Sequence, residues 1–248
     1  MELFHTIFYI PLYNFLVWLY VVLPVADIGL AIIIITVVIK GILFPLTFRS
    51  LKSQRDMQAI QPKIKEIREK YKDEKEKMAS ELMAIYKNNN VNPMASCLPL
   101  LIQLPIFIAL YNVLRDGFGA IQTDILYGFV HAPEMLNPIS FGIIDLSAIS
   151  IPLAVLAAIA QYFQVKKTMT QRPMKSLREK EGAKDEDMMA NMNRMMLYFM
   201  PVITLMIGST SLPGGVMLYW LVTTGLTILL YSIFLKQPKP ELEAKVIE

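Results

Sequence analysis

The chain has 248 residues, of which 54% are hydrophobic and 18% are charged, and its formal net charge at pH 7 is +3. The apolar residues gather into long blocks with almost no charge, a distribution that is typical of membrane-spanning helices. This pattern excludes an ordinary soluble globular protein. The weak net charge, divided between acidic and basic residues, also gives no basis for direct nucleic-acid recognition.

The first apolar block, residues 1–26, has polar side chains at helical spacing. They are Glu2, His5, Thr6, Tyr9, Tyr13 and Asn14. A helix with one polar and one apolar face is predicted to lie in the membrane interface. A tilted additional span is the alternative. A signal peptide is not favoured, because no Lys or Arg precedes the apolar run.

Five spans are predicted in the core of the chain, residues 27–235, since about 20 apolar residues are needed to cross the hydrocarbon layer. Their approximate bounds are 27–48, 92–114, 146–165, 194–210 and 214–235. The last two share one uncharged block of 41 residues, which is expected to bend at "STSLPGG", residues 209–215. The predicted fold class is therefore an all-α polytopic membrane protein.

Lys and Arg are unevenly divided among the connecting segments. Residues 49–90 contain 11 of the chain's 24, residues 166–194 contain 8, and the short tail 236–248 contains 3. Loops rich in Lys and Arg remain in the cytoplasm. The pattern predicts a multi-pass topology with the N-terminus outside and the C-terminus inside.

Residues 49–90 are predicted to form a cytoplasmic helical hairpin. Apolar residues with helical spacing form a stripe, which consists of Met57, Ile60, Ile64, Ile67 and Tyr71. The predicted break is "KDEK", residues 72–75, where Asp73 can cap a second helix. Two interpretations remain open: a solvated linker whose apolar stripes pack on each other, or a docking arm for clients and partners.

Motifs for enzymatic chemistry are absent from the sequence. There is no phosphate-binding G-x-x-x-x-G-K-[ST] string, and the two histidines, His5 and His131, are far apart. No H-E-x-x-H or paired-cysteine set suggests a metal site. We therefore predict that the protein is not an enzyme and needs no cofactor or metal.

Lys40 lies inside the first predicted core span. A charge at the centre of a spanning helix costs about 2.5–3.5 kcal/mol on insertion scales, so its presence requires an explanation. The side chain either extends to the cytoplasmic headgroups or faces a wet cavity between helices, with Thr36 and Gln103 as neighbours. The depth of Lys40 in the span favours the cavity.

Four strings in this sequence resemble the YidC family of membrane protein insertases. They are "IIIITVVIKGILFPLT", "QPKIKEIREKY", "VNPMASCLPLLIQLPIFIALYNVL" and "MLYFMPVITLMIGSTSLPGGVMLYWLVTTGLTIL". The resemblance covers about residues 6–235, in the family's order and spacing. It implies a five-helix core with a hydrophilic groove that opens to the cytoplasm and to lipid but is closed on the outside.

The resemblance also implies the position of a client-binding groove. Lys40 matches the family's conserved cation, which is arginine in most members, so charge is kept while the two-pronged hydrogen bonding of arginine is lost. Including two glutamines from the third span, the predicted groove residues are Lys40, Thr36, Gln103, Phe107, Tyr219, Trp220, Gln161 and Gln164.

The resemblance predicts a membrane protein insertase and chaperone of a bacterial inner or plasma membrane. Its expected partners are nascent membrane proteins and the lipid bilayer, with the Sec translocon, the ribosome or a targeting factor as candidates for the hairpin. The short sequence before the core resembles the family's compact form, and the tail suggests no strong ribosome binding. The alternatives are a small-solute or ion transporter that uses the same cavity, and a passive assembly factor.

Overall fold

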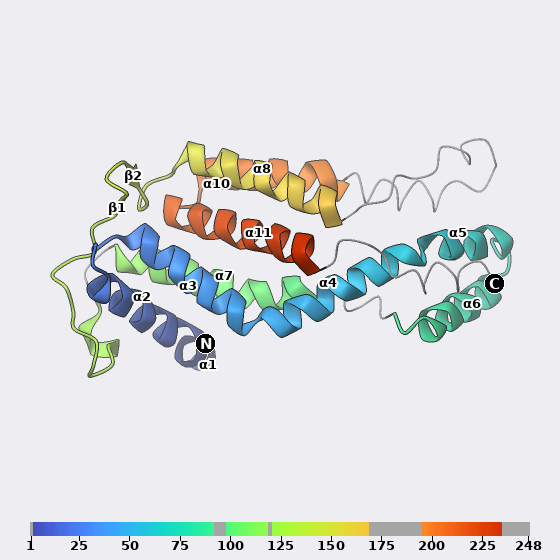
Figure 1. The fold of residues 1–248 in the computed structure, drawn as a ribbon, viewed down its shortest axis with the longest axis horizontal. Coiled ribbons are helices and arrows are strands. Elements are labelled where there is room, and N and C mark those ends of the chain that lie inside the picture. The colour runs from blue at the N-terminus through green and yellow to red at the C-terminus, as the bar shows by residue number, and fades with distance from the viewer. Residues whose placement is uncertain (1, 92–97, 119–120, 169–194, 235–248) are drawn as a thin grey trace. The chain divides into compact units, whose positions relative to one another are not determined.

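The computed structural model describes residues 2–91, 98–118, 121–168 and 195–234 (Figure 1). These residues are mostly helical, and the chain divides into two compact units. Unit 1 consists of Met1–Phe44, Leu100–Gln161 and Pro201–Thr227, and unit 2 consists of Pro45–Pro99, Tyr162–Met200 and Ile228–Glu248. The predicted tail 236–248 lies outside the described residues.

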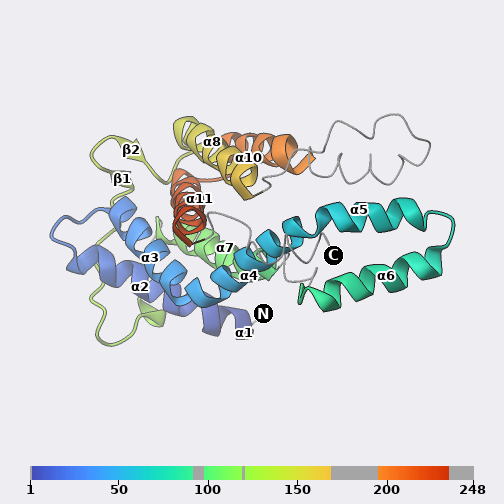
Figure 2. The same cartoon turned by 45° about the vertical axis from the view of Figure 1, so that its right-hand side comes forward.

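Unit 1 is a set of apolar helices with one small hairpin. Its elements are α1 Glu2–Phe4, a π-helix His5–Tyr9, α2 Ile10–Val22, α3 Ile28–Ile42, α7 Leu98–Gly117, a 3-10 turn Thr123–Ile125, β1 Ile139–Ser140, β2 Ile144–Asp145, α8 Ile151–Thr168, α10 Met200–Thr210 and α11 Gly214–Phe234. The last turns of α8 and α11 belong to unit 2, as does the π-helix Met195–Phe199 before α10. In Figures 1 and 2, α11 runs between the α8 and α10 pair and the α3 and α7 pair.

The length and composition of the described helices agree with a membrane protein. Glu2–Val22 and Gly214–Phe234 are each long and apolar enough to cross a bilayer. The pair formed by α3 and α4 is a third candidate if it is counted as one broken span, and Leu197–Thr210 is apolar but shorter. The five-span count remains a prediction.

The predicted span 27–48 is not one continuous helix. Helix α3 ends at Ile42, and α4, Phe44–Ala59, begins after Leu43. Pro45 explains the interruption, because proline has no N–H to donate and its ring clashes with the carbonyl four residues earlier, but it fits the first turn of a new helix. A proline inside an apolar run was the available sequence signal.

Helix α8 starts five residues later than the predicted span 146–165. Before it, the Leu146 N–H donates to the Pro138 carbonyl at 2.9 Å, and the Asp145 carboxylate accepts the Ser147 hydroxyl at 2.6 Å and the Ser147 N–H at 2.8 Å. These bonds from Ser147 lower the pKa of Asp145 below its ordinary value. The first uncharged residues of the predicted span therefore form a turn that leads into α8.

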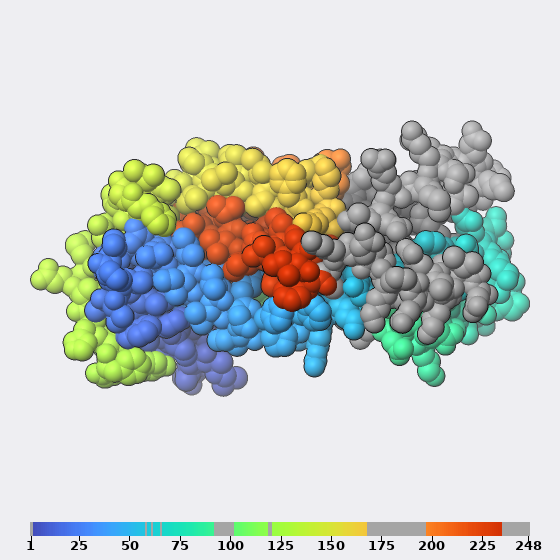
Figure 3. All heavy atoms as spheres, in the orientation of Figure 1, coloured from blue at the N-terminus to red at the C-terminus, as the bar shows by residue number. Residues whose placement is uncertain are grey.

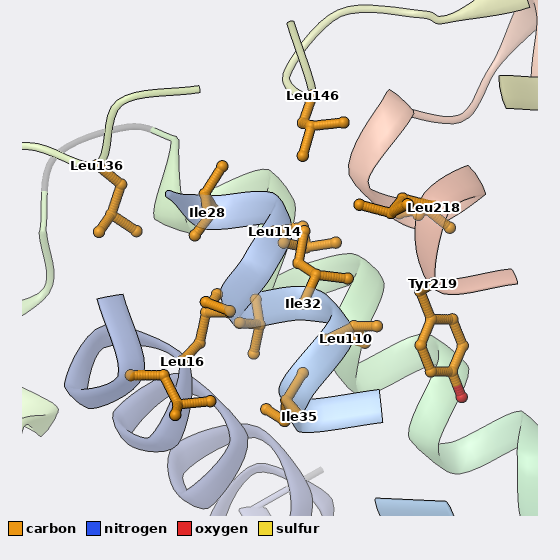
Figure 4. Packing of buried hydrophobic residues seen from close by; sticks show 14 of the residues in the cluster. Leu16, Ile28, Ile32, Ile35, Leu110, Leu114, Leu136, Leu146, Leu218 and Tyr219 are labelled. Atoms are coloured by element: carbon orange, nitrogen blue, oxygen red, sulfur yellow. The ribbon is translucent and has the colours of Figure 1, made fainter. Parts of the chain in front are cut away.

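The core of unit 1 lies mainly between α2, α3, α7 and α11. Ile28, Ile32 and Ile35 recur at helical spacing on one face of α3 and are completely buried. Figure 4 shows Leu110 and Leu114 of α7 beside them, with Leu16 of α2 and Leu146 of the turn before α8 at the edges. In the space-filling view, α11 lies between α3 and α8 on the visible face (Figure 3).

Helices α10 and α11 form the predicted hairpin. The first ends at Thr210 and the second begins at Gly214, so the bend falls inside the predicted segment 209–215. Gly208 of α10 packs closely on its neighbours, since a Cβ at this position would lie 2.6 Å from Met217 Sδ and 3.0 Å from Ala154 Cβ. Glycine allows α10 to approach both α11 and α8.

The described part of unit 2 includes the predicted helical hairpin, built from α4, α5 Gln61–Lys70 and α6 Lys75–Asn88. The break falls where the sequence predicts, but Asp73 is not the cap. Glu74 occupies the N-cap position and its side chain makes no capping hydrogen bond. Helix α6 therefore starts one residue later than predicted, and it lacks the predicted side-chain cap.

The C-terminal end of α6 is held by two backbone hydrogen bonds. Asn90 has a φ of 52°, its N–H donates to the Lys87 carbonyl, and the Val91 N–H donates to the Tyr86 carbonyl at 2.9 Å. This is a Schellman motif with asparagine in the left-handed position. It carries Val91, which is 5% exposed, into the hairpin's apolar core.

The predicted apolar stripe of the hairpin is largely used inside the hairpin. Ile60 and Ile64 are 0% and 1% exposed, and Met57 packs on the same cluster. The partly buried side chains that complete this cluster from α6 are Leu82, Ile85 and Tyr86. This packing agrees with the first of the two interpretations, in which the stripes of the two helices cover each other.

Candidate intramembrane polar site

Lys40 is the start of a short polar chain in unit 1. It lies in the last turn of α3, and its Nζ donates to Gln103 Oε1 of α7 at 3.4 Å. The Lys40 side chain is partly buried, and within the part of the chain that the structure describes no carboxylate pairs with it. An ammonium in this position is therefore held by a single long hydrogen bond to a neutral amide.

The chain continues from α7 to α11. Gln103 Nε2 donates to the hydroxyl of Tyr219, and Tyr219 is 2% exposed. One turn further along α11, the buried Thr223 hydroxyl has no hydrogen-bond partner of normal geometry among the described residues. Three helices thus supply an ammonium, an amide and a phenol in series, followed by an unsatisfied hydroxyl.

Two aromatic residues accompany the polar chain. Phe107 follows Gln103 by one helical turn, Trp220 follows Tyr219 directly, and the two rings meet edge to face with centroids 5.4 Å apart. The structure therefore brings together five of the predicted groove residues: Lys40, Gln103, Phe107, Tyr219 and Trp220.

Thr36 has a different environment from the one expected. It is 0% exposed, and its hydroxyl donates to the Ile32 carbonyl of its own helix at 2.6 Å. Threonine in membrane helices commonly forms this bond. Its hydroxyl proton is then not available for a hydrogen bond to Gln103. Thr36 shares a helix face with Lys40 but is not hydrogen-bonded to the polar chain.

The two predicted glutamines of the third span belong to different units. Gln161 is 8% exposed and accepts a hydrogen bond from the Thr204 hydroxyl of α10. It therefore joins α8 to α10. Gln164 lies beyond Tyr162, where the chain passes into unit 2.

The polar side chains of the N-terminal helix bond to other parts of the protein chain. Asn14 is 2% exposed; its amide donates to the Ile125 carbonyl at 2.9 Å, and its oxygen accepts the Tyr127 N–H at 2.6 Å. The Tyr9 hydroxyl donates to the Asp116 carboxylate in the last turn of α7, and the hydroxyls of Tyr13 and Tyr20 accept backbone N–H groups of the segment between α7 and α8. These partners lie more than 100 residues away and leave no local signal in the sequence.

Asp27 is the strongest polar contact that sequence reasoning missed. It is 7% exposed and caps α3 by accepting the Leu30 N–H at 2.9 Å. It also accepts the Ser140 hydroxyl at 2.6 Å and the Phe141 N–H at 2.5 Å, which fixes the β1–β2 hairpin to the start of α3. An aspartate immediately before a long apolar run was the available signal, since aspartate is a preferred N-cap. Together, Asp27, Asn14, Tyr9, Tyr13 and Tyr20 are called the loop clamp below.

The groups of the Lys40 chain are suited to binding a ligand. An ammonium, an amide and a phenol donate hydrogen bonds and attract negative charge. Across the described ranges, no group of three or more His, Cys, Asp or Glu side chains is placed to hold a metal ion.

Long apolar helices that surround a short polar chain are typical of a helical membrane protein. The family described as "60Kd inner membrane protein" matches residues 18–241. The chain belongs to this family.

Its relatives are bacterial membrane proteins. The chain is 36% identical over 208 residues to the "Membrane protein insertase YidC" of Pelobacter propionicus, which covers 82% of this chain and 34% of that protein. The proteins of the same name from Syntrophobacter fumaroxidans and Beijerinckia indica are 37% and 32% identical, over 81% and 88% of this chain and 33% and 35% of theirs. The chain spans about a third of the length of these curated relatives, and it is a bacterial inner-membrane protein.

Proposed function

We propose that this protein inserts short or single-span membrane proteins into the bilayer and assists their folding. In this proposal, five spans with the N-terminus outside enclose a hydrophilic groove, and Lys40 provides its positive charge. The observation that carries the proposal is the Lys40, Gln103 and Tyr219 chain, which has no carboxylate partner among the described residues of an insertase-family protein.

The lack of an acidic partner for Lys40 among the described residues supports a role in binding. A lysine that only stabilised the fold would be expected to have an acidic partner, because a charge within the membrane is costly. Lys40 instead has one 3.4 Å hydrogen bond to Gln103. Its ammonium can therefore attract an acidic residue in the polar flank of an incoming client.

The energetics need no nucleotide. A polar groove shortens the distance that a client's polar flank crosses in hydrocarbon, and the apolar client segment then moves sideways into lipid. The membrane potential adds about 2.3 kcal/mol per charge per 100 mV when negative charge moves outward. The edge-to-face pair of Phe107 and Trp220 offers an apolar wall beside the charge.

The helical hairpin is proposed as the contact for the Sec translocon, the ribosome or a targeting factor. Because Ile60 and Ile64 are buried against α6, their part in docking is to hold the two helices together. Met83, which is 70% exposed on α6, offers an apolar side chain on the outer surface of the hairpin. Replacing Met83 with Glu is expected to weaken partner binding without loosening the hairpin.

The test of the function is insertion by purified protein reconstituted in liposomes. A single-span client with an acidic flank is expected to become protected from protease, and Lys40→Ala and Lys40→Glu to reduce this insertion severalfold. Lys40→Arg should retain insertion, since the charge is kept. Lys52→Ala, at an exposed position of α4, is the control.

The possible results distinguish the charge mechanism from the insertase function itself. Equal insertion by the wild type, Lys40→Ala and Lys40→Glu would reject the charge mechanism. No insertion even by the wild type would reject the function as proposed. Crosslinks from positions 103 and 220 to a stalled client test the groove independently of the rate.

A further inference from the structure

The tip of the β1–β2 hairpin has an unusual backbone for its sequence. Ser140 to Ile143 form a tight turn in which the Ile143 N–H donates to the Ser140 carbonyl at 3.1 Å. Phe141 and Gly142, the two central residues, have φ values of 51° and 72°, as in a type I′ turn. Asparagine is the favoured residue before glycine in this turn, and a bulky residue with positive φ is a strained choice.

The strained residue is also exposed and apolar. Phe141 is 54% exposed, Ile143 is 82% exposed, and Ile139 at the other side of the turn is 46% exposed. The one polar side chain of the tip, Ser140, is fully buried and bonded to Asp27. The tip, residues 139–144, therefore presents only apolar side chains outward, while the exposed Asp145 lies at the base of the hairpin.

The base of the hairpin is fixed to the beginnings of the membrane helices. Asp27 bonds to the Leu30 N–H and the Phe141 N–H, which joins the tip to the start of α3. After β2, the Leu146 carbonyl accepts the Gly215 N–H at 2.9 Å, and the Ala148 carbonyl accepts the Gly214 N–H at 2.8 Å. These bonds join the hairpin to the start of α11.

Two further apolar side chains near the start of α8 are exposed, with the exposed Asp145 and Ser147 between them and the tip in sequence. Ile149 is 49% exposed in the turn after the hairpin, and Ile151 is 60% exposed at the first residue of α8. In the proposed topology the starts of α3, α8 and α11 lie at one membrane boundary, and the tip is then at the level where headgroups meet acyl chains. Apolar and aromatic side chains are favoured there.

We propose that Phe141 and Ile143 insert into the headgroup and acyl boundary of the bilayer, so that the hairpin is a lipid anchor at the starts of α3, α8 and α11. The absence of charged side chains from residues 139–144 suits insertion of the tip into the apolar boundary of a bilayer, with the charged Asp145 at the base of the hairpin. This proposal requires that α3, α8 and α11 cross the bilayer, and it does not depend on insertase activity.

The experiment measures the depth of the hairpin tip in vesicles of phosphatidylethanolamine and phosphatidylglycerol. In the full chain with Cys97→Ser, a nitroxide label is attached at Ile143→Cys or, as the control, at Glu134→Cys, which is exposed in the same connecting segment. Collisions with oxygen, which concentrates in lipid, are compared with collisions with a water-soluble nickel chelate. The oxygen-to-nickel ratio is expected to be severalfold higher at position 143 than at position 134.

A second variant separates lipid contact from turn formation. Phe141→Asn places the preferred residue in the turn and removes the aromatic ring, so it should keep or raise thermal stability while lowering the oxygen-to-nickel ratio at position 143. Equal ratios at positions 143 and 134 would overturn the anchor. Shielding of position 143 from both reagents would also overturn it, because a protein surface would then cover the tip.

Discussion

Two polar regions of unit 1 differ in how completely their hydrogen bonds are satisfied. In the loop clamp, Asp27 accepts three hydrogen bonds of 2.5–2.9 Å and Asn14 uses both its amide and its oxygen on the facing segment. Around Lys40, one 3.4 Å bond holds a charge, and the Thr223 hydroxyl has no partner of normal geometry among the described residues.

The difference indicates different roles. Buried polar groups with complete partners specify a single arrangement of the chain, and removing one partner leaves the other unsatisfied. Groups with incomplete partners contribute little to stability and remain available to a ligand. We expect substitutions in the loop clamp to reduce stability and substitutions at the Lys40 chain to reduce function.

The largest effect is expected for Asp27→Ala. The change removes an N-cap and two hydrogen bonds to the β1–β2 hairpin, which together should cost about 2–4 kcal/mol. The measurement is the midpoint of thermal unfolding in detergent. Asp145→Ala is the matched control, because Asp145 also accepts several hydrogen bonds but is exposed, and it should cost less than about 1 kcal/mol. Equal losses in the two variants would contradict the importance of burial at Asp27.

A smaller loss is expected for Gly29→Ala. Alanine is the better helix former by about 1 kcal/mol, but its Cβ would lie 2.0 Å from Ser140 Oγ. The hairpin must therefore move away from α3, at a net cost of about 1–3 kcal/mol. The readout is faster proteolysis between residues 138 and 146. Gly225→Ala, where the added Cβ meets nothing within 4 Å, should leave cleavage unchanged.

Asn14→Leu should have a more local effect. Leucine fills nearly the same volume but leaves the Tyr127 N–H and the Ile125 carbonyl without their partner, which costs about 1–2 kcal/mol. Hydrogen exchange at the Tyr127 amide is expected to accelerate. Thr6→Val, at an exposed position of the same helix, should not change it. Unchanged exchange in Asn14→Leu would show that the segment is held without this contact.

Local patterns in the sequence predicted the structural features that depend on residues close together in the chain. The bend between Thr210 and Gly214 follows from Pro213 and two glycines, and the contact of Lys40 with Gln103 was expected from two polar residues inside apolar runs. The start of α4 carried a usable signal in Pro45. That signal was outweighed by the apolar character of the run.

The loop clamp could not be found in this way. In the sequence, Asn14 and Tyr13 belong to the polar side of a predicted interfacial helix, and the backbone groups that they bind are more than 100 residues distant. A polar face shows only that its groups need partners, and either water or protein can supply them. The start of α8 was misplaced for a related reason, since Leu146 is apolar but its N–H bonds to Pro138 and not within a helix.

The smallest effect on stability is expected for Lys40→Met, which separates the two regions most directly. Methionine has nearly the length of lysine and carries no charge, so the variant removes one long hydrogen bond together with the cost of a cation in the membrane, about 2.5–3.5 kcal/mol on insertion scales. The unfolding midpoint in detergent should stay the same or rise, while insertion of a client with an acidic flank falls. A drop in the midpoint as large as that of Asp27→Ala would place Lys40 among the residues that hold the fold. In that case the open hydrogen bonds around Lys40 would not indicate a ligand, and the contrast between the two regions would have to be explained by packing alone.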